Sequence, residues 1–286
     1  MENQQHYTSK NKGDETDASS YRPIGLANTL YKLWTRHITN TLYEFAEGNS
    51  ILSTTQAGFR KQKDPIHQLE NVIMALKDAK LFYKDIYALI VDFTSAFNTL
   101  QIPVKRGTIQ GDTLSPYLFL FDMEPLLRWL HVGGRGYVHT CIPKEDELQT
   151  HLANNISSAS FADDLLCPAG NLKNPKVQAN KLTPYSNWAG LIISGSKTLV
   201  TGSQNVSPSK DQNGLTPSEA LEHQLKNNIL VQNQETKYIT PSSPFLYLGV
   251  TLTMDLNWKH QHRRMDESLS KSLTPLKALM PHHSKH

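Results

Sequence analysis

The sequence predicts a mixed α/β fold, and three patterns support this prediction. Residues 86–91 form a short, almost continuous apolar run, which is typical of a strand covered on both faces. Residues 159–167 place Asp163 and Asp164 between a small-residue run and an apolar run, which indicates a β-hairpin with both acids at or beside its turn. Apolar residues also recur at helical spacing in several stretches. Strands and helices are therefore both expected.

Length and composition limit the class of protein. The 286 residues suffice for one large or two small domains with a real core. No apolar run approaches the ~20 residues of a membrane span, and the polar start predicts no signal peptide, so we expect an intracellular, cytoplasmic or nuclear protein that is not secreted. Cys141 and Cys167 form no CxxC pair, which argues against a zinc knuckle and for a reducing compartment. The net charge is only +3, so any affinity for nucleic acid depends on local basic clusters.

The first part of the chain predicts a tail and two helices. Residues 1–20 are polar without periodicity and are expected to be disordered. A helix that ends near Gly48 is indicated by an apolar stripe, which we interpret as core: Leu30, Trp34, Ile38, Leu42 and Phe45. A second helix is expected to start at Asp64 and Pro65, an N-cap acid followed by proline at the first helical position. Its expected buried face consists of Ile66, Leu69, Val72, Ile73 and Leu76.

A third helix is predicted after the middle of the chain. Ser115 is its expected N-cap and Pro116 its first residue, and Pro125 is expected to kink it. Residues 133–136 (GGRG) resemble a phosphate-binding loop, but the simpler interpretation is that they end this helix, because no strand-to-helix pattern flanks them.

The last part of the chain predicts two strands, an insertion and a helical tail. Strands are expected at residues 191–193 and 245–251. Residues 202–214 have the Ser/Asn/Gln/Pro-rich composition of a linker or surface insertion, and a short helix is expected to follow them. From Trp258 onward the pattern is basic and helical.

Three acids are the candidate chemical groups. Taken alone, an Asp163–Asp164 pair is more often a solvated turn, but close carboxylates repel each other unless a cation neutralises them. Asp92 follows the apolar run of residues 86–91 and meets the hairpin if the two strands are neighbours. Three such acids can hold two Mg²⁺ or Mn²⁺ ions roughly 3.5–4 Å apart, which is the arrangement for phosphoryl transfer.

Three segments, in this order, resemble motifs A, B and C of reverse transcriptases of the non-LTR retrotransposon type: residues 92–97 (DFTSAF), 110–116 (QGDTLSP) and 161–164 (FADD). Shorter pieces agree: residues 21–24 and 56–60 are similar to the fingers motifs, residues 190–198 to part of motif D, with Ser194 in place of the usual Asn, and residues 247–250 to the primer-side segment. The resemblance covers residues 21–252. It implies a polymerase palm-and-fingers fold whose small antiparallel palm sheet carries the acids, with residues 253–286 as an incomplete thumb or helical tail.

The resemblance also implies an activity. An RNA-directed DNA polymerase transfers a nucleotide from a dNTP to a primer 3′-hydroxyl, so the implied partners are an RNA template, a DNA primer and a dNTP, without a membrane. The implied cofactor is Mg²⁺ or Mn²⁺. Asp92 and Asp163 are the implied metal ligands, Asp164 supports them on the primer side, and Lys197 completes the implied catalytic set.

Further residues are implied to bind the nucleotide and the primer. The resemblance implies that Arg60 binds the triphosphate, where a planar guanidinium suits phosphate, although its basic cluster taken alone is more often a solvated loop. Phe97 occupies the position of the aromatic ring that collides with a 2′-hydroxyl, and Gln110 and Gly111 form the loop that holds the nucleotide against its template base. The implied primer-side residues are Tyr247, Leu248 and Gly249.

The chain departs from the family between motifs A and B. Residues 98–105 stand where the family has several dozen residues, including a helix under the palm sheet, and a crossover between parallel strands needs at least ~10–12 residues. We therefore expect little or no primer extension, although the three acids are present. The alternative is a catalytically dead mobile-element remnant with at most weak nucleic-acid binding. A hydrolytic two-metal nuclease is more distant, because Gln110 and Phe97 suit nucleotide selection.

Overall fold

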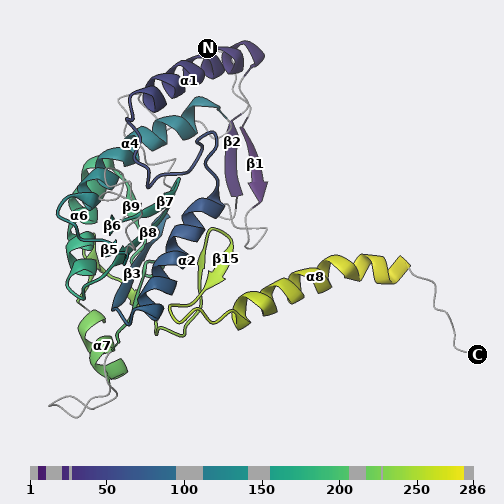
Figure 1. Cartoon of the computed structure of the whole chain (residues 1–286). Coiled ribbons are helices and arrows are strands. Elements are labelled where there is room, and N and C mark those ends of the chain that lie inside the picture. The colour runs from purple at the N-terminus through teal and green to yellow at the C-terminus, as the bar shows by residue number, and fades with distance from the viewer. Residues whose placement is uncertain are drawn as a thin grey trace, which may run out of the picture.

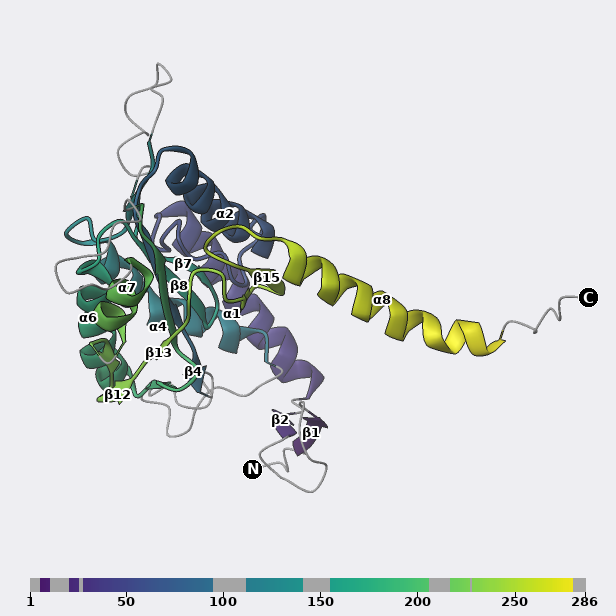
Figure 2. The ribbon, with the colours of Figure 1, turned by 90° about the horizontal axis from the view of Figure 1, so that it is seen from below.

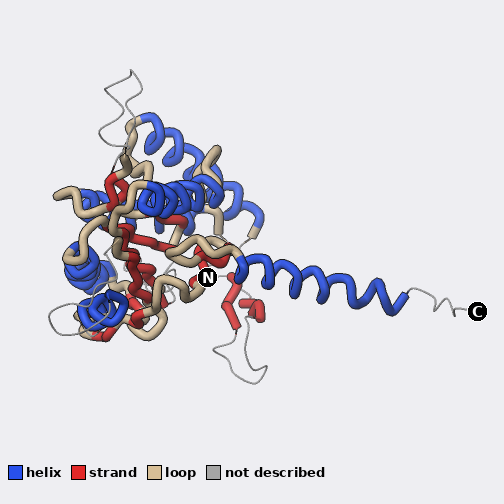
Figure 3. Tube along the Cα trace, turned by 60° about the horizontal axis from the view of Figure 1, so that its bottom comes forward, coloured by secondary structure: helices blue, strands red, loops and turns tan. Residues whose placement is uncertain are grey.

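Helices cover both sides of a central sheet, so the mixed α/β prediction is confirmed (Figure 1). The computed structural model describes residues 6–10, 21–25, 28–94, 112–140, 155–205, 217–226 and 228–279. The strands lie between α2 on one side and α4 and α6 on the other (Figure 2); these helices are Pro65–Leu81, Leu114–His131 and Asn174–Ala189. The last helix, α8 (Lys259–Leu279), extends away from this body (Figure 3). In the described part of the chain, no helix has the length and apolarity needed to cross a membrane.

The central sheet has five strands in the order β13-β10-β3-β8-β7. Their bounds are Lys237–Tyr238, Leu199–Ser203, Ile86–Val91, Asp164–Ala169 and Ala159–Phe161. β13 runs parallel to β10, whereas every other neighbouring pair in this sheet is antiparallel. The predicted strand and hairpin are therefore confirmed, and they are neighbours. Because both neighbours of β3 are antiparallel, β3 needs no crossover to a parallel partner, contrary to our expectation.

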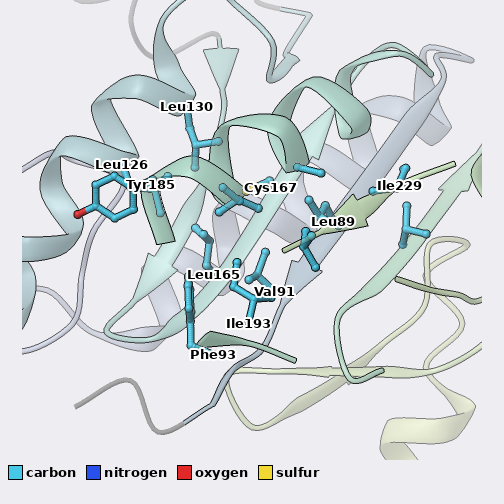
Figure 4. Packing of buried hydrophobic residues seen from close by; sticks show 14 of the residues in the cluster. Leu89, Val91, Phe93, Leu126, Leu130, Leu165, Cys167, Tyr185, Ile193 and Ile229 are labelled. Carbon is cyan, nitrogen blue, oxygen red and sulfur yellow. The ribbon is translucent and has the colours of Figure 1, made fainter. Parts of the chain in front are cut away.

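Two hydrophobic clusters pack on opposite faces of the sheet. Leu89 and Val91 of β3 belong to the cluster with α4 and α6 (Figure 4), whereas Ile86 and Ala88 belong to the cluster with α2. Successive residues of a strand face opposite sides of the sheet, so a strand between two helical layers must be apolar at nearly every position. This explains the continuous apolar run.

Helix α1 (Thr29–Gly48) ends at Gly48 as predicted, but most of its apolar stripe is not core. Leu30, Trp34 and Phe45 expose 78%, 64% and 58% of their surface. The helix instead buries Thr35 and Ala46 and packs Leu42 and Tyr43 into a small cluster, whose buried members are Ala46, Leu52, Tyr117 and Leu120. The interpretation as core is therefore wrong for Leu30, Trp34 and Phe45, because periodicity shows that a helix has an apolar face and does not show what covers it.

The predicted helix starts are right for α2 and wrong for α4. The Asp64 side chain accepts the His67 N–H at 3.1 Å, and Pro65 is the first residue of α2. In the expected buried face of this helix, Ile66 is exposed. Helix α4 begins at Leu114, and its N-cap is Thr113, which makes no side-chain capping bond. The expected N-cap, Ser115, is buried inside the first turn.

The glycines after α4 turn the chain, as the simpler interpretation had it. Helix α4 ends at His131, and Gly133 and Gly134 follow with φ values of 88° and 62°. Only glycine enters this left-handed region without a steric penalty. The Gly134 N–H donates to the His131 carbonyl at 3.3 Å.

Two other predictions need correction. His6–Lys10 form strand β1, which pairs with β2 (Tyr21–Gly25), so residues 6–10 are not part of a disordered tail. The strand expected at residues 245–251 is a hairpin of β14 (Phe245–Tyr247) and β15 (Val250–Leu252). Its turn contains Leu248 and Gly249, both with positive φ, which breaks a single extended strand.

The insertion and the remaining elements complete the described chain. Strand β10 includes Gly202 and Ser203, so the insertion cannot start before Gln204, and residues 206–214 lie outside the described residues. A short helix, α7 (Pro217–Leu225), follows as expected, whereas α6 was not predicted. The remaining strands pair as β4 with β9, β5 with β6, and β11 with β12; their bounds are Phe93–Thr94, Ile192–Ile193, Tyr137–Val138, Asn155–Ile156, Leu230–Val231 and Gln234–Glu235.

Candidate active site

The three candidate acids gather at one end of the central sheet. Asp92 directly follows β3, whose last residue, Val91, pairs with Leu165 of β8. Asp163 lies in the tight turn between β7 and β8, and Asp164 is the first residue of β8. Because β3 and β8 are antiparallel, the end of one strand meets the start of the other. The sheet therefore brings Asp92 next to the hairpin turn.

The charges of the three acids act on one another. Although Asp164 reaches the surface, partial burial of its carboxyl raises its pKa, and the nearby charges of Asp163 and Asp92 raise it further. Like charges at short range disfavour the ionised form. A bound cation would relieve this repulsion, so the electrostatics of the site favour binding a positive group.

The loop between β9 and β10 holds the backbone of Asp92 on both sides. The Ser194 N–H donates to the Asp92 carbonyl at 2.9 Å, and the Asp92 N–H donates to Thr198 Oγ1 at 3.3 Å. Thr198 is fully buried, whereas Lys197, its neighbour on the same loop, is exposed. The segment that resembles motif D thus lies against Asp92 and presents the predicted lysine to solvent.

The acids fit a divalent metal by chemistry, but their geometry does not form a finished metal site. Carboxylate oxygens are the ligands that Mg²⁺ and Mn²⁺ prefer. Within the described ranges, no three His, Cys, Asp or Glu side chains are grouped closely enough to hold a metal ion. An ion shared by Asp92 and Asp163 stays a prediction.

Arg60 is placed away from the task that we expected of it. Its Nε and Nη2 donate to the two carboxylate oxygens of Glu47 at 2.8 and 2.7 Å, and its Nη1 donates to the carbonyls of Ser53 and Gln56 at 2.6 and 2.9 Å. The side chain is only 7% exposed. A guanidinium has five N–H donors, and this arrangement engages four of them. In this conformation Arg60 orders its own loop, and its donors face protein rather than a triphosphate.

Tyr247 is buried rather than open to a primer. Its hydroxyl donates to the Ala159 carbonyl of β7 at 3.0 Å, and the residue is 3% exposed. Burial, followed by the nearby Asp164 charge, raises the pKa of this phenol. Tyr247 therefore packs against the β7–β8 hairpin. Leu248 and Gly249 form the turn of the β14–β15 hairpin.

Three predicted site residues cannot be placed. Phe97, Gln110 and Gly111 lie outside the described residues, as does the shortened stretch of residues 98–105. The first described residue after this stretch is Asp112, which is buried, and within the described part of the chain no hydrogen-bond partner reaches its Oδ1.

Gln56 contacts the hairpin turn, and sequence reasoning did not single it out. Its side chain is fully buried and bonds to the backbone of Ala162, the residue before Asp163. The available signal was its position at the start of residues 56–60, which resemble a fingers motif. That signal drew attention to the charged Arg60 and not to the neutral amide.

The fold and the site define a class of protein: a mixed α/β domain that gathers carboxylates where two antiparallel strands of one sheet meet. A model of the family described as reverse transcriptase (RNA-dependent DNA polymerase) matches residues 9–252. The chain therefore belongs to the reverse transcriptase family.

A curated relative points to a mobile element. The chain is similar to the probable RNA-directed DNA polymerase from transposon BS of Drosophila melanogaster, with 34% identity over 87 residues. The match covers 29% of this chain and 9% of that protein, so the chain spans a small part of its relative's length. A transposon relative is consistent with the non-LTR type that the motif order indicates.

Proposed function

We propose that this chain is the catalytic region of a retrotransposon reverse transcriptase of the non-LTR type. In the proposed reaction, a DNA primer paired with an RNA template attacks the α-phosphate of a dNTP through its 3′-hydroxyl, and pyrophosphate leaves. The observation that carries the proposal is the antiparallel pairing of β3 with β8, which sets Asp92 beside the Asp163–Asp164 turn. The central sheet is the proposed palm, and α8 is the start of the proposed thumb.

In this proposal each acid has a role. Asp92 and Asp163 would hold Mg²⁺ or Mn²⁺, and Asp164 supports them on the primer side. When bound, such ions stabilise the charge that develops on the attacking and leaving oxygens. The raised pKa of Asp164 supports this assignment, because the three acids are close enough to repel one another without a cation.

The other proposed roles belong to residues around the acids. Lys197 is proposed as a catalytic residue because it is exposed on the loop that holds the Asp92 backbone. Phe97 is proposed to exclude the 2′-hydroxyl, and Gln110 and Gly111 to hold the nucleotide. For Arg60 the ion pair with Glu47 favours a supporting role in place of a direct grip on phosphate.

Primer extension tests the proposal. We compare Asp163→Asn with Asp266→Asn, an exposed carboxylate on α8, in a version of the chain that carries a family-length segment after Leu100. Removing a group that stabilises the charge developing in the transition state lowers the reaction rate by on the order of a hundredfold or more. We expect Asp163→Asn to lose Mg²⁺-dependent extension on an RNA template and Asp266→Asn to retain it. Equal extension by both variants would contradict the proposal.

The second candidate is a catalytically dead remnant of a mobile element. The shortened stretch of residues 98–105 favours it, because the family places a helix there. The ion pair that occupies Arg60 also fits a domain without a bound nucleotide. Absence of extension both in the chain as written and in the version with the inserted segment would favour this candidate.

A further inference from the structure

One buried amide holds both polar groups of a single turn residue. Gln56 Oε1 accepts the Ala162 N–H at 3.0 Å, and Gln56 Nε2 lies 3.4 Å from the Ala162 carbonyl, to which it donates. The same Nε2 donates to Ser160 Oγ at 3.0 Å. Gln56 is fully buried and 106 positions away from Ala162 in the sequence. This contact therefore joins the loop before α2 to the hairpin that carries the acids.

Ala162 adopts a conformation that alanine disfavours. Its φ is 56°, in the left-handed region, which is unfavourable for a residue with a Cβ. Such a conformation persists only where the surroundings hold it in place. Ala162 directly precedes Asp163, so its dihedral angles determine where the backbone of Asp163 lies. The groups that hold Ala162 therefore also position Asp163.

The loop around Gln56 is shaped to reach this turn. The Ala57 N–H donates to the Ser160 carbonyl at 3.0 Å, and the Ser160 N–H donates to the Thr55 carbonyl at 2.9 Å, so the loop pairs with β7. A Cβ on Gly58 would lie 2.3 Å from the Ala162 nitrogen, which is too close for a Cβ contact, so the loop or the turn would have to shift. The Gly58 N–H donates to Gln56 Oε1 at 2.8 Å and fixes the amide oxygen from its own side.

We propose that Gln56 is a positioning residue for the acids: it locks Ala162 in its left-handed turn and thereby aims Asp163 toward Asp92 and Asp164. This inference rests on the proposed function in so far as the aimed carboxylate is expected to bind a divalent metal. Arg60 takes part indirectly, because it donates to the Gln56 carbonyl and anchors the loop.

The structure offers a comparison variant on helix α6, whose Gln178 contacts the other strand of the same β-hairpin. Gln178 is also fully buried, and its Nε2 donates to the Pro168 carbonyl at 3.1 Å and to the Arg135 carbonyl at 3.3 Å. It holds the far end of β8, away from the acids. Gln56→Met and Gln178→Met each remove one fully buried amide, but the Gln56 side chain makes four hydrogen bonds and the Gln178 side chain two. A merely structural role therefore predicts a change in stability for both variants and a change in metal affinity for neither.

Metal affinity is the first measurement. Mn²⁺ is titrated calorimetrically into the full chain, Gln56→Met, Gln178→Met and Asp163→Asn, and urea unfolding records the stability of each. Loss of a group that orients a metal ligand weakens metal affinity by about 10- to 100-fold. We expect this loss for Gln56→Met and an unchanged affinity for Gln178→Met. If the unaltered chain binds Mn²⁺, equal affinities for these two variants, whether retained or lost, would overturn the inference.

A second pair of variants tests the same turn without removing the amide. Gly58→Ala pushes a methyl group against the Ala162 backbone, whereas Gly48→Ala places one in open space. We expect weaker Mn²⁺ binding for Gly58→Ala alone. This pair keeps the inference testable if Gln56→Met fails to fold.

Hydrogen exchange separates this inference from the proposed function. If the unaltered chain does not bind Mn²⁺, or if Asp163→Asn binds it equally well, the proposed function fails, and the backbone measurement decides the inference. Gln56→Met is expected to speed amide exchange at residues 160–163, and Gln178→Met is not. Unchanged exchange at the turn in Gln56→Met would show that the amide does not hold it, whatever the metal result.

Discussion

At the scale of single residues, Arg60 is a cation whose contacts stabilise the fold. Its guanidinium forms a bidentate pair with Glu47 and also donates to two loop carbonyls. A buried charge pair of this kind tolerates poorly the loss of one partner, because the other charge then remains buried and unpaired. The pair connects α1 to the Gln56 loop, so it affects the candidate site by fixing the position of that loop.

Asp122 of α4 is a carboxylate that burial disfavours. Burial raises its pKa to about 6, and within the described residues no hydrogen-bond partner reaches its Oδ2. Burial favours the protonated carboxyl of Asp122 in the folded state. The stability that this protonation contributes is complete below the pKa of the unfolded chain, about 4, and is lost as the pH rises through about 6. At neutral pH the charged form therefore opposes folding.

We predict that Asp122→Asn raises the free energy of unfolding at pH 7. The amide has the same shape without the charge, and after allowing for partial exposure the gain is on the order of 1–2 kcal/mol. Urea unfolding at pH 7 and pH 4 measures it, and the gain should vanish at the lower pH. Asp266→Asn on exposed α8 is the control. A variant less stable than the unaltered chain at pH 7 would contradict the prediction.

At the scale of elements, Asp78 ties α2 to the strand after α4. Burial alone would raise its pKa, but hydrogen bonds from Tyr137, from the Thr140 N–H and from Lys84 lower it overall. The Tyr137 hydroxyl donates to Asp78 Oδ2 at 2.6 Å, and the Thr140 N–H donates to Oδ1 at 3.0 Å. One carboxylate thus holds β5 against the end of the helix.

Asp78→Asn should lower the free energy of unfolding at pH 7, in contrast to Asp122→Asn, which should raise it. Because the folded pKa is lowered, the stability that Asp78 contributes is present above the unfolded value of about 4 and is lost as the pH falls through the folded pKa. Hydrogen bonds to a charged group contribute about 1.5–3 kcal/mol, so a loss of this order is expected at pH 7. The same urea series measures it. A loss that stays constant down to pH 3 would show that the charge is not responsible.

Helix α1 has ends that are set by neighbouring residues and a buried face that is set by distant ones. Its caps are local, since Asn28 Oδ1 accepts the Tyr31 N–H at 2.7 Å and the helix ends before Asn49. Its packing is not local, because residues such as Thr35 and Ala46 are buried by α4 and the following loop. A small set of contacts on one side thus leaves the more apolar side exposed.

At the scale of the whole molecule, three layers put the acids at one end of the sheet. Helices α4 and α6 cover one face, and α2 with the β14–β15 hairpin covers the other. The strand that leads to Asp92 is hydrogen-bonded on both sides, because β3 lies between two antiparallel neighbours. The connection from β4 to α4 passes through residues 95–111, which lie outside the described residues.

We predict that a family-length segment inserted after Leu100 raises primer extension. The chain as written should show little or none, since a misplacement of ~1 Å at a catalytic group lowers the rate on the order of a hundredfold. Mg²⁺-dependent extension on an RNA template compares the two versions, and Asp163→Asn in the longer version gives the background. Equal and robust extension by both versions would show that the short connection does not matter.

Much of the fold follows from local patterns. The apolar run of residues 86–91, the hairpin around Asp163 and the start of α2 depend on neighbouring residues, and the structure has each of them. The predicted end of α1 and the turn after α4 rest on glycine in the same way. Helix α6 was missed because its apolar positions are interrupted by Asn, Gln and Pro184, which weakens the helical period.

The sequence by itself determined the family, the order of its motifs and which three acids are candidates for the site, because these depend on residue type and spacing. Only the tertiary structure decided the partners of the side chains. Glu47 occupies Arg60, Tyr247 lies buried under the hairpin, and Gln56 holds the turn at Ala162. The physical reason is that such contacts join residues far apart in the chain, where no local period or propensity records which groups will meet.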